Sequence, residues 1–322
     1  MKRVFFLFFL LISHLAALAA LPEPARCIAP AKPGGGFDLT CQLLSASLVS
    51  SGALTKPLPI AYLPGGIGAL AFRQVVTQKP ADSGAVVAFS SGSLLNLAQG
   101  RFGLHSASDV RWLVSLGLDH GIVAVRQDAP FKNLPELLRT LRDSPNSVVF
   151  GAGGSIGSQD WMKAALLAKA AGVSHKAMRF VAYEGGGEAF TALQGNYVQV
   201  IAGDAAEVAR LMDSGAKIKV LAVLAEHRLP GRWAQIPTAR EQGFDIRWPI
   251  IRGLYMSKDS SQPVQRDWIE AIRQATSSAA FAHELSRFGL LPEWRTGAAL
   301  DQLVEQQIID YKKLVIDFGL TR

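Results

Sequence analysis

Two glycine triplets, Gly34-Gly35-Gly36 and Gly185-Gly186-Gly187, lie where a short apolar run gives way to a helical pattern. Glycines leave backbone N–H groups uncovered, and the first turn of a helix offers N–H donors without intrahelical partners together with a partial positive charge. These features bind an anion without any cationic side chain. The chemistry that the two turns predict is therefore the binding of a small anion.

Asp38 follows the first triplet and has two possible roles. Its carboxylate can accept backbone N–H groups and fix the loop, as a helix cap does, or it can recognise a hydroxyl group or a water molecule of the ligand. We favour the first role, because a carboxylate beside an anionic ligand would repel it.

Two further turns follow apolar runs and add hydroxyl groups, at residues 90–93 and 151–159. Ser155 and Ser158 suit the oxygens of a carboxylate, but each suits equally well the capping of the helix that follows. Glu184 and Glu188 could form an acid pair, although an ordinary preference for acidic residues in a first helical turn explains them more simply. Because ligands of open α/β sheets bind outside the carboxyl ends of the strands, we expect all four turns to converge.

Signatures of catalysis, nucleotide binding and metal binding are missing from the sequence. Residues 151–157 approach a dinucleotide fingerprint, but Ile156 stands where the last glycine is needed, and neither G-x-S-x-G nor H-E-x-x-H occurs. The histidines beyond the N-terminal segment stand far apart. We therefore expect a binding protein that is not an enzyme, with no cofactor and no metal ion. The alternative is a periplasmic hydrolase or isomerase acting on a small carboxylic acid.

Short apolar runs alternate with amphipathic helical patterns along the chain. This alternation predicts an α/β fold with mainly parallel sheets, and a mature chain of about 300 residues exceeds the usual size of one hydrophobic core. We expect two lobes and a hinge, with residues 20–119 and 244–322 forming a discontinuous first lobe and residues 120–243 the second. The runs are residues 26–29, 60–63, 86–90, 122–125, 148–150, 179–183, 198–202 and 219–224.

Residues 1–19 have the pattern of a signal peptide: Lys2 and Arg3, an apolar stretch, and the A-x-A sequence of Ala17 and Ala19. We expect cleavage near Ala20 and export to the periplasm. The formal net charge of +7 becomes +5 without Lys2 and Arg3, and the remaining basic residues are scattered among acidic ones. This scatter argues against a nucleic-acid partner.

The two cysteines, Cys27 and Cys41, lie in the first predicted strand and in the first turns of the helix that follows. Export to an oxidising compartment favours a disulfide between them, while two buried thiols are the alternative.

Five segments carry a resemblance to a known family: CIAPAKPGGGFDLT at 27–40, YLPGGIGA at 62–69, SIGSQDWMK at 155–163, EGGGE at 184–188 and WPIIRG at 248–253. With them the chain resembles the periplasmic solute receptors of tripartite tricarboxylate transporters, the Bug family, over essentially its whole mature length, and is similar to the citrate-binding members. The resemblance implies a type II periplasmic-binding-protein fold. Its two lobes would clamp a small carboxylate and deliver it to a membrane permease with one large and one small subunit.

The same resemblance implies that the loop with Pro33, Gly34, Gly35 and Asp38 forms one wall of the site, and the loop at residues 183–186 another. Lys32 departs from the family, in which many relatives carry Phe before the proline loop. This lysine either supplies charge for an extra carboxylate or points to solvent. A ligand-loaded adaptor that contacts a sensor kinase is a further possible role of the chain.

We expect the ligand to be citrate or a related di- or tricarboxylate, and Lys32, Arg179 and Arg252 are the candidate cations for an extra carboxylate. The expected ligand contacts are Lys32, Pro33, Gly34, Gly35, Gly36, Asp38, Ser91, Gly92, Ser93, Ser155, Ser158, Gln159, Tyr183, Glu184, Gly185, Gly186 and Asp204.

Overall fold

Strands and helices alternate through residues 21–320, the part of the chain that the computed structural model describes; the predicted signal peptide lies outside these residues. The strands are β1 (Arg26–Ala29), β2 (Ile60–Tyr62), β3 (Ala85–Ser90), β4 (Val110–Arg126), β5 (Val149–Gly153), β6 (Arg179–Tyr183), β7 (Val200–Asp204), β8 (Ile218–Leu224) and β9 (Pro249–Ser257). The helices are α1 (Gly36–Ser50), α2 (Ala69–Thr77), α3 (Ser91–Ala98), α4 (Leu134–Asp143), α5 (Gln159–Ala170), α6 (Gly186–Gln194), α7 (Ala205–Asp213), α8 (Gln262–Thr276), α9 (Ala279–Phe288) and α10 (Ala298–Asp317).

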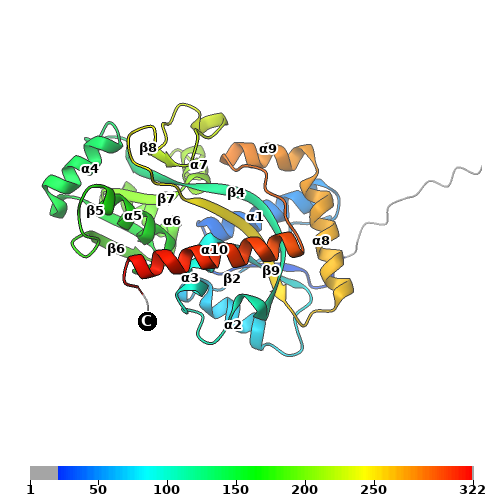
Figure 1. The fold of residues 1–322 in the computed structure, drawn as a ribbon. Helices are drawn as coiled ribbons and strands as arrows, with labels where there is room; N and C mark the ends of the chain where they lie inside the picture. The colour runs from blue at the N-terminus through cyan, green and yellow to red at the C-terminus, as the bar shows by residue number, and fades with distance from the viewer. Residues whose placement is uncertain (1–20, 321–322) are drawn as a thin grey trace, which may run out of the picture.

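The long strand β4 connects two groups of strands (Figure 1). On one side, β4 pairs with β9, and β9 pairs with β3 of the parallel set β2-β1-β3. On the other side, β4 pairs with β8 and with β7 of the parallel set β7-β5-β6. The expected two-lobed α/β fold of a periplasmic binding protein is confirmed, with sheets that are mixed because β4, β8 and β9 run antiparallel to their neighbours.

The pairing partners of β4 change between His120, which pairs with β9, and Gly121, which pairs with β7 and β8. This change lies beside the boundary between residues 119 and 120 that the sequence predicts, and the division into lobes stays a prediction. Helix α10 packs on both lobes, with Leu300 in the core of the first and Val315 in that of the second. Figure 1 shows α10 running across the front of the molecule from one lobe to the other.

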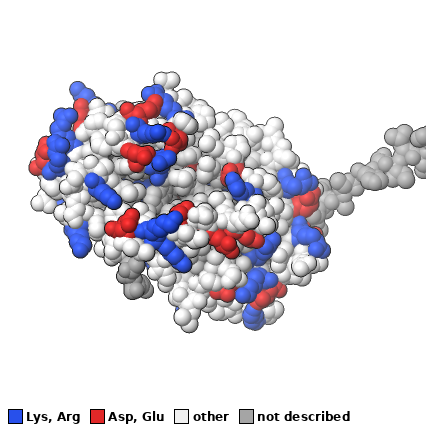
Figure 2. Space-filling view, in the orientation of Figure 1, with Lys and Arg blue, Asp and Glu red and all other residues white. Residues whose placement is uncertain are grey.

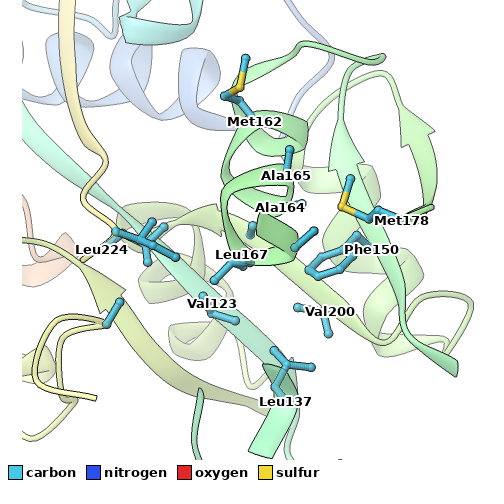
Figure 3. Packing of buried hydrophobic residues seen from close by; sticks show 14 of the residues in the cluster. Val123, Leu137, Phe150, Met162, Ala164, Ala165, Leu167, Met178, Val200 and Leu224 are labelled. Atoms are coloured by element: carbon cyan, nitrogen blue, oxygen red, sulfur yellow. The ribbon is translucent and has the colours of Figure 1, made fainter. Parts of the chain in front are cut away.

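The core of the second lobe forms where α4 and α5 cover the strands (Figure 3). Phe150 on β5 and Val200 on β7 pack with Leu167 on α5, while Leu137 on α4 is fully buried in the same cluster. Each such side chain contributes roughly 1.5–3 kcal/mol through its burial. This packing holds β5 and β7 in place, and the turns that follow these strands reach the space between the lobes.

A disulfide joins Cys27 of β1 to Cys41 of α1, with a Cα–Cα distance of 5.7 Å, so the first of the two alternatives for these cysteines is confirmed. Both residues are fully buried in the first-lobe core. The loop that the bridge closes contains the first glycine triplet. Closing a loop of this length stabilises the folded protein by about 3 kcal/mol on the chain-entropy estimate. The bridge therefore restrains the glycine turn within the loop.

No helix in residues 21–320 is long and apolar enough to cross a membrane. Figure 2 shows basic and acidic side chains interspersed over the face in view. This face lacks the concentration of basic residues that nucleic-acid-binding proteins present.

Candidate functional site

A cavity of about 60 Å³ lies between the lobes, where β1, β3, β5 and β7 end. A single water molecule requires about 10–15 Å³ of such space, so the cleft is nearly closed. The cavity is lined by Ala31, Gly35, Gly36, Phe37, Ile67, Ser90, Gly92, Asn96, Gly153, Gln159, Asp160, Glu184, Gly185, Gly186, Asp204, Glu207 and Arg252.

The two glycine triplets meet at this cavity. Gly35 is the N-cap of α1 and Gly185 the N-cap of α6, and neither cap is closed by a side chain. A Cβ atom on Gly187 would lie 3.0 Å from the carbonyl carbon of Gly34, so the turns are in backbone contact across the cleft. The positive φ of Gly34, 98°, also favours glycine there. Two helix N-termini, one from each lobe, therefore present backbone donors to one small space.

Asp38 fixes the first turn. Its Oδ2 accepts the Gly34 N–H at 2.8 Å, and its Oδ1 accepts the Tyr62 hydroxyl at 2.8 Å. Arg210 of α7 donates to Oδ2 at 3.1 Å, and Gln42 donates to both oxygens. The carboxylate does not line the cavity, and its role here is the structural one of the two considered from the sequence.

Beneath the glycine turns lies a buried network of charges. Arg252 of β9, which is 1% exposed, donates from Nε to Asp119 at 3.0 Å and from Nη2 to Asp204 at 2.9 Å. Lys163 of α5, fully buried, contacts the other oxygen of Asp204 at 2.5 Å and Asp160 at 3.0 Å. Buried charges are tolerated only when paired in this way. Asp204 thus links the two cations at the floor of the cleft.

The pKa values of the carboxyl groups in this network diverge. Burial raises the pKa of Asp119 and that of Asp160, against the opposing effect of their cationic neighbours. Burial also acts on Asp204, but Lys163 and Arg252 outweigh it and hold the pKa of Asp204 below its usual range. Asp204 is therefore the carboxylate that both cations keep ionised.

Glu207, in the first turn of α7, adds a fourth carboxyl group to this region and lines the cavity. Burial raises its pKa to about 8, with smaller contributions in the same direction from Asp204 and Asp160. At neutral pH, Glu207 is thus mainly a neutral hydrogen-bond donor.

The predicted serines serve the protein's own backbone. Ser91 donates to Gln307 and accepts the Ile251 N–H, while Ser93 completes the capping box of α3 and Ser158 caps α5. Ser155 is exposed and accepts from Arg101 at 3.2 Å. The structure does not bring these four side chains to the cavity lining. The capping alternative that the sequence left open thus describes Ser158.

Gln159 lies in the cavity wall as predicted. Its Nε2 donates to both oxygens of Asp204, at 3.1 and 2.9 Å, while its Oε1 has no hydrogen-bond partner among residues 21–320. The Oδ1 of Asn96, also in the wall, lacks a partner within the same residues. These buried oxygens are two acceptors that a ligand hydroxyl group can satisfy.

Four more predicted contacts and one candidate cation lie outside the cavity lining. Lys32 is exposed and pairs with Glu188 at 2.7 Å, which links the lobes at the rim. Pro33 is exposed beside it, and Gly34 packs against Gly187. Tyr183 is half-buried and lines a separate surface pocket. Arg179 donates to the backbone of Asn146, so Arg252 is the candidate cation that reaches the cavity.

Sequence reasoning missed Glu207, Asp160 and Asn96 as lining residues, together with the apolar Phe37 and Ile67. Glu207 and Asp160 each occupy a first helical turn, where acidic residues are common, so they carried no distinguishing signal. A usable clue was position, since Asp160 directly follows Gln159 and Glu207 lies one helical turn after Asp204, two residues already expected to contact the ligand.

Comparisons with known proteins agree with this geometry. A model of the family described as "Tripartite tricarboxylate transporter family receptor" matches residues 47–320. A UPF0065 protein of Cupriavidus necator is 22% identical over 303 residues, covering 93% of this chain and 89% of the relative. A UPF0065 protein of Bordetella pertussis is 24% identical over 324 residues, covering 99% of this chain and 97% of the relative.

Solved structures show the same fold. The periplasmic binding protein BugD has a TM-score of 0.83 at 21% identity, covering 93% of this chain and 99% of its own. MatC of Rhodopseudomonas palustris, solved with bound malate, has a TM-score of 0.79 at 21% identity, covering 90% of this chain and 98% of its own. Rpa4515 of R. palustris, solved with adipate, has a TM-score of 0.82 at 19% identity, covering 92% of this chain and 97% of its own.

The matched family consists of solute receptors rather than enzymes, which confirms the expectation of a non-enzymatic protein. The fold is that of a periplasmic binding protein, and the comparisons give no support for a sensor kinase as a partner. The family model spans most of the chain, including the second glycine turn and both buried cations. The chain belongs to the receptor family of the tripartite tricarboxylate transporters.

Proposed function

We propose that this protein captures citrate or a related di- or tricarboxylate in the cleft and delivers it to the membrane permease of a tripartite tricarboxylate transporter. The observation that carries the proposal is the meeting of the α1 and α6 N-termini at one cavity between the lobes. Their free backbone donors suit carboxylate oxygens. Bound malate and adipate in two proteins of the same fold support a ligand of this class.

The buried acceptors favour a hydroxy acid. Gln159 and Asn96 line the cavity, and Gln159 Oε1 and Asn96 Oδ1 are buried without hydrogen-bond partners among the described residues. A buried unpaired acceptor costs about 1–3 kcal/mol, which a ligand hydroxyl group recovers by donating to it. Citrate and malate carry such a hydroxyl group, whereas tricarballylate and succinate do not.

Ligand entry requires the lobes to part. The cavity of about 60 Å³ leaves little room beside the packed glycine turns, and Lys32 to Glu188 and Arg210 to Asp38 link the lobes. The ligand must favour the closed state over the open one for closure to report binding. We infer an open form that admits the ligand and a closed form, resembling the present one, that retains it.

Isothermal titration of the protein without its N-terminal segment, carrying residues 21–322, tests the proposal. The matched pairs citrate and tricarballylate, then malate and succinate, separate the carboxylate requirement from the hydroxyl requirement. We expect binding within this set, with the hydroxy acid tighter by roughly tenfold in each pair, which corresponds to about 1.4 kcal/mol. Sulfate and phosphate serve as control anions.

Absence of binding to all four acids would overturn the proposal. Equal affinities within each pair would remove the hydroxyl preference and leave the carboxylate receptor standing. Delivery to the permease is tested separately, by adding the loaded receptor to vesicles that contain the permease subunits and measuring uptake of the labelled acid. Uptake that does not depend on the receptor would contradict delivery.

A further inference from the structure

Glu207 occupies an unusual position in the cleft. Glu207 is 6% exposed, and its carboxyl group lies between the glycine turns of the two lobes. A Cβ atom on Gly186 would lie 2.8 Å from the Glu207 Cδ, and one on Gly35 would lie 3.7 Å from its Oε1. The carboxyl group is therefore placed beside the backbone donors that we assign to the ligand.

The other three carboxylates of the floor have assigned partners. Asp119 and Asp204 accept hydrogen bonds from Arg252, and Asp160 accepts the Gly153 N–H at 2.8 Å and pairs with Lys163. No hydrogen bond within residues 21–320 reaches the Glu207 carboxyl group. A buried polar group that lines a cavity without a partner indicates a contact that a ligand completes.

The charge balance decides the form in which Glu207 makes this contact. Four carboxyl groups share the floor with two cations, Lys163 and Arg252, so an ionised Glu207 would add to an excess of negative charge. An anionic ligand entering beside it would be repelled. The pKa of Glu207, which burial raises to about 8, keeps the group neutral at lower pH.

The charged groups on the surrounding elements set this balance. They are Asp38 on α1, Asp119 on β4, Asp160 and Lys163 on α5, Glu184 and Glu188 beside the second triplet, Asp204 and Arg210 at α7, and Arg252 on β9. Arg210 is paired with Asp38, and Glu188 with Lys32, so these four largely offset one another. The floor groups therefore dominate the field at Glu207.

We propose that the Glu207 carboxyl group donates a hydrogen bond to a carboxylate of the bound ligand, so that capture of the anion requires one proton on the receptor. This inference rests on the proposed function and adds a residue that determines specificity. A ligand ammonium group would instead pair with ionised Glu207. The helix N-termini on both sides of the carboxyl group favour the anionic partner, because their N–H donors repel a cation.

Titration calorimetry from about pH 7.5 to about pH 9.5 tests the inference, because di- and tricarboxylates are almost fully ionised over this range. We expect the wild-type affinity for malate or citrate to fall by about tenfold for each pH unit above about 8, as the protonated fraction falls. Buffers of different ionisation enthalpy measure the accompanying protons. Uptake should rise from a small fraction of a proton toward about one proton per ligand at the upper end.

The variant Glu207→Gln keeps a donor that does not titrate, so its affinity should be nearly constant over the same range and its proton uptake near zero. Glu270→Gln, on the exposed face of α8, is the matched control and should retain the wild-type profile. If Glu207→Gln does not fold, the buffer series on the wild type alone decides the matter.

Three outcomes separate the hypotheses. Acids that bind without proton uptake, or a Glu207→Gln profile that equals the wild-type one, would overturn this inference and leave the carboxylate receptor intact. An affinity for these acids that increases with pH would overturn it as well. No binding of any acid at any pH would overturn the proposed function, and this inference with it.

Discussion

The two walls of the cleft differ in the chemical groups that they present to the cavity. Apart from Arg252, the first-lobe wall consists of backbone, apolar and neutral polar groups, with Gly35, Gly36, Phe37 and Ile67 among them. The second-lobe wall carries acidic side chains, and the buried Lys163 lies behind it. The first wall thus offers shape and uncharged donors, while the second sets the electrostatic field.

Arg252 joins the two walls. It lies on β9, which pairs with β3 of the first sheet, and its guanidinium group reaches Asp204 at the end of β7 in the second. A Cβ atom on Gly36 would collide with this guanidinium group, so the charge lies directly behind the first glycine turn. The second wall alone is acidic and would repel an anion. We therefore expect anion affinity to depend on closure, which brings the donors of the first wall against the second.

The largest expected effect comes from removing this link. Arg252→Ala leaves Asp119 and Asp204 buried without their shared partner, and such a change typically costs about 3–5 kcal/mol of unfolding free energy. Urea denaturation measures the loss. Arg273→Ala, which breaks an exposed pair with Glu270, is the control and should cost less than about 1 kcal/mol. Equal losses in both variants would contradict the importance of the buried network.

The second expected effect is a change in stability with pH that arises from Glu207 in the second wall. The folded protein keeps a proton on Glu207 up to about pH 8, whereas the unfolded chain loses it near the ordinary value of 4.5. Unfolding free energy therefore falls as pH rises through this window, by roughly 1 kcal/mol per pH unit from this group. Glu207→Gln lacks this titration, so its stability relative to the wild type should increase with pH.

Thermal unfolding of the ligand-free proteins at several pH values from about 5 to about 9 measures this difference. Asp119 and Asp160, whose pKa values burial also raises, remain in both proteins and cancel in the comparison. A constant difference between variant and wild type across the range would show that Glu207 titrates normally.

The third effect concerns contact between the walls and uses two glycines of one triplet. Gly187→Ala would place a methyl group 3.0 Å from the Gly34 carbonyl carbon, whereas Gly185→Ala meets nothing within 4 Å. We expect the first change to hinder closure and weaken ligand binding by roughly tenfold, and the second to have a smaller effect. Calorimetry gives the affinities, and small-angle scattering shows whether the ligand still compacts the molecule. The reverse order would contradict the assigned closure.

Much of the fold was predictable because local patterns and tertiary structure agree. Runs at 26–29 and 179–183 became β1 and β6 with those bounds. Strand β4 was predicted only over residues 122–125, although it begins at Val110. Ser115, Gly117 and Asp119 interrupt its apolar pattern before the strand passes to the second lobe at Gly121. The Ser115 and Asp119 side chains bond to Glu293 and Arg252, which are distant in the sequence.

The site was predictable where backbone makes it and less so where side chains do. Glycine triplets can be recognised in the sequence by composition alone, and residues of both triplets line the cavity. A serine beside a helix start can either bind a ligand or cap the helix, and the sequence does not distinguish the two roles. The role of Ser158 therefore could not be assigned in advance. The raised pKa of Glu207 could not be recognised either, because it arises chiefly from burial and in part from Asp160, which only the fold brings near.

The smallest expected effect tests whether charge at the rim matters. Lys32 and Glu188 link the walls at 2.7 Å, but their side chains are 49% and 40% exposed. Lys32→Ala should therefore cost less than about 1 kcal/mol and change citrate affinity by no more than about twofold, less still in high salt. Lys79→Ala, which removes an exposed pair with Asp259 away from the cleft, is the control. If Lys32→Ala weakened citrate selectively over malate, the lysine would bind the third carboxylate, and charge would then belong to the first wall as well.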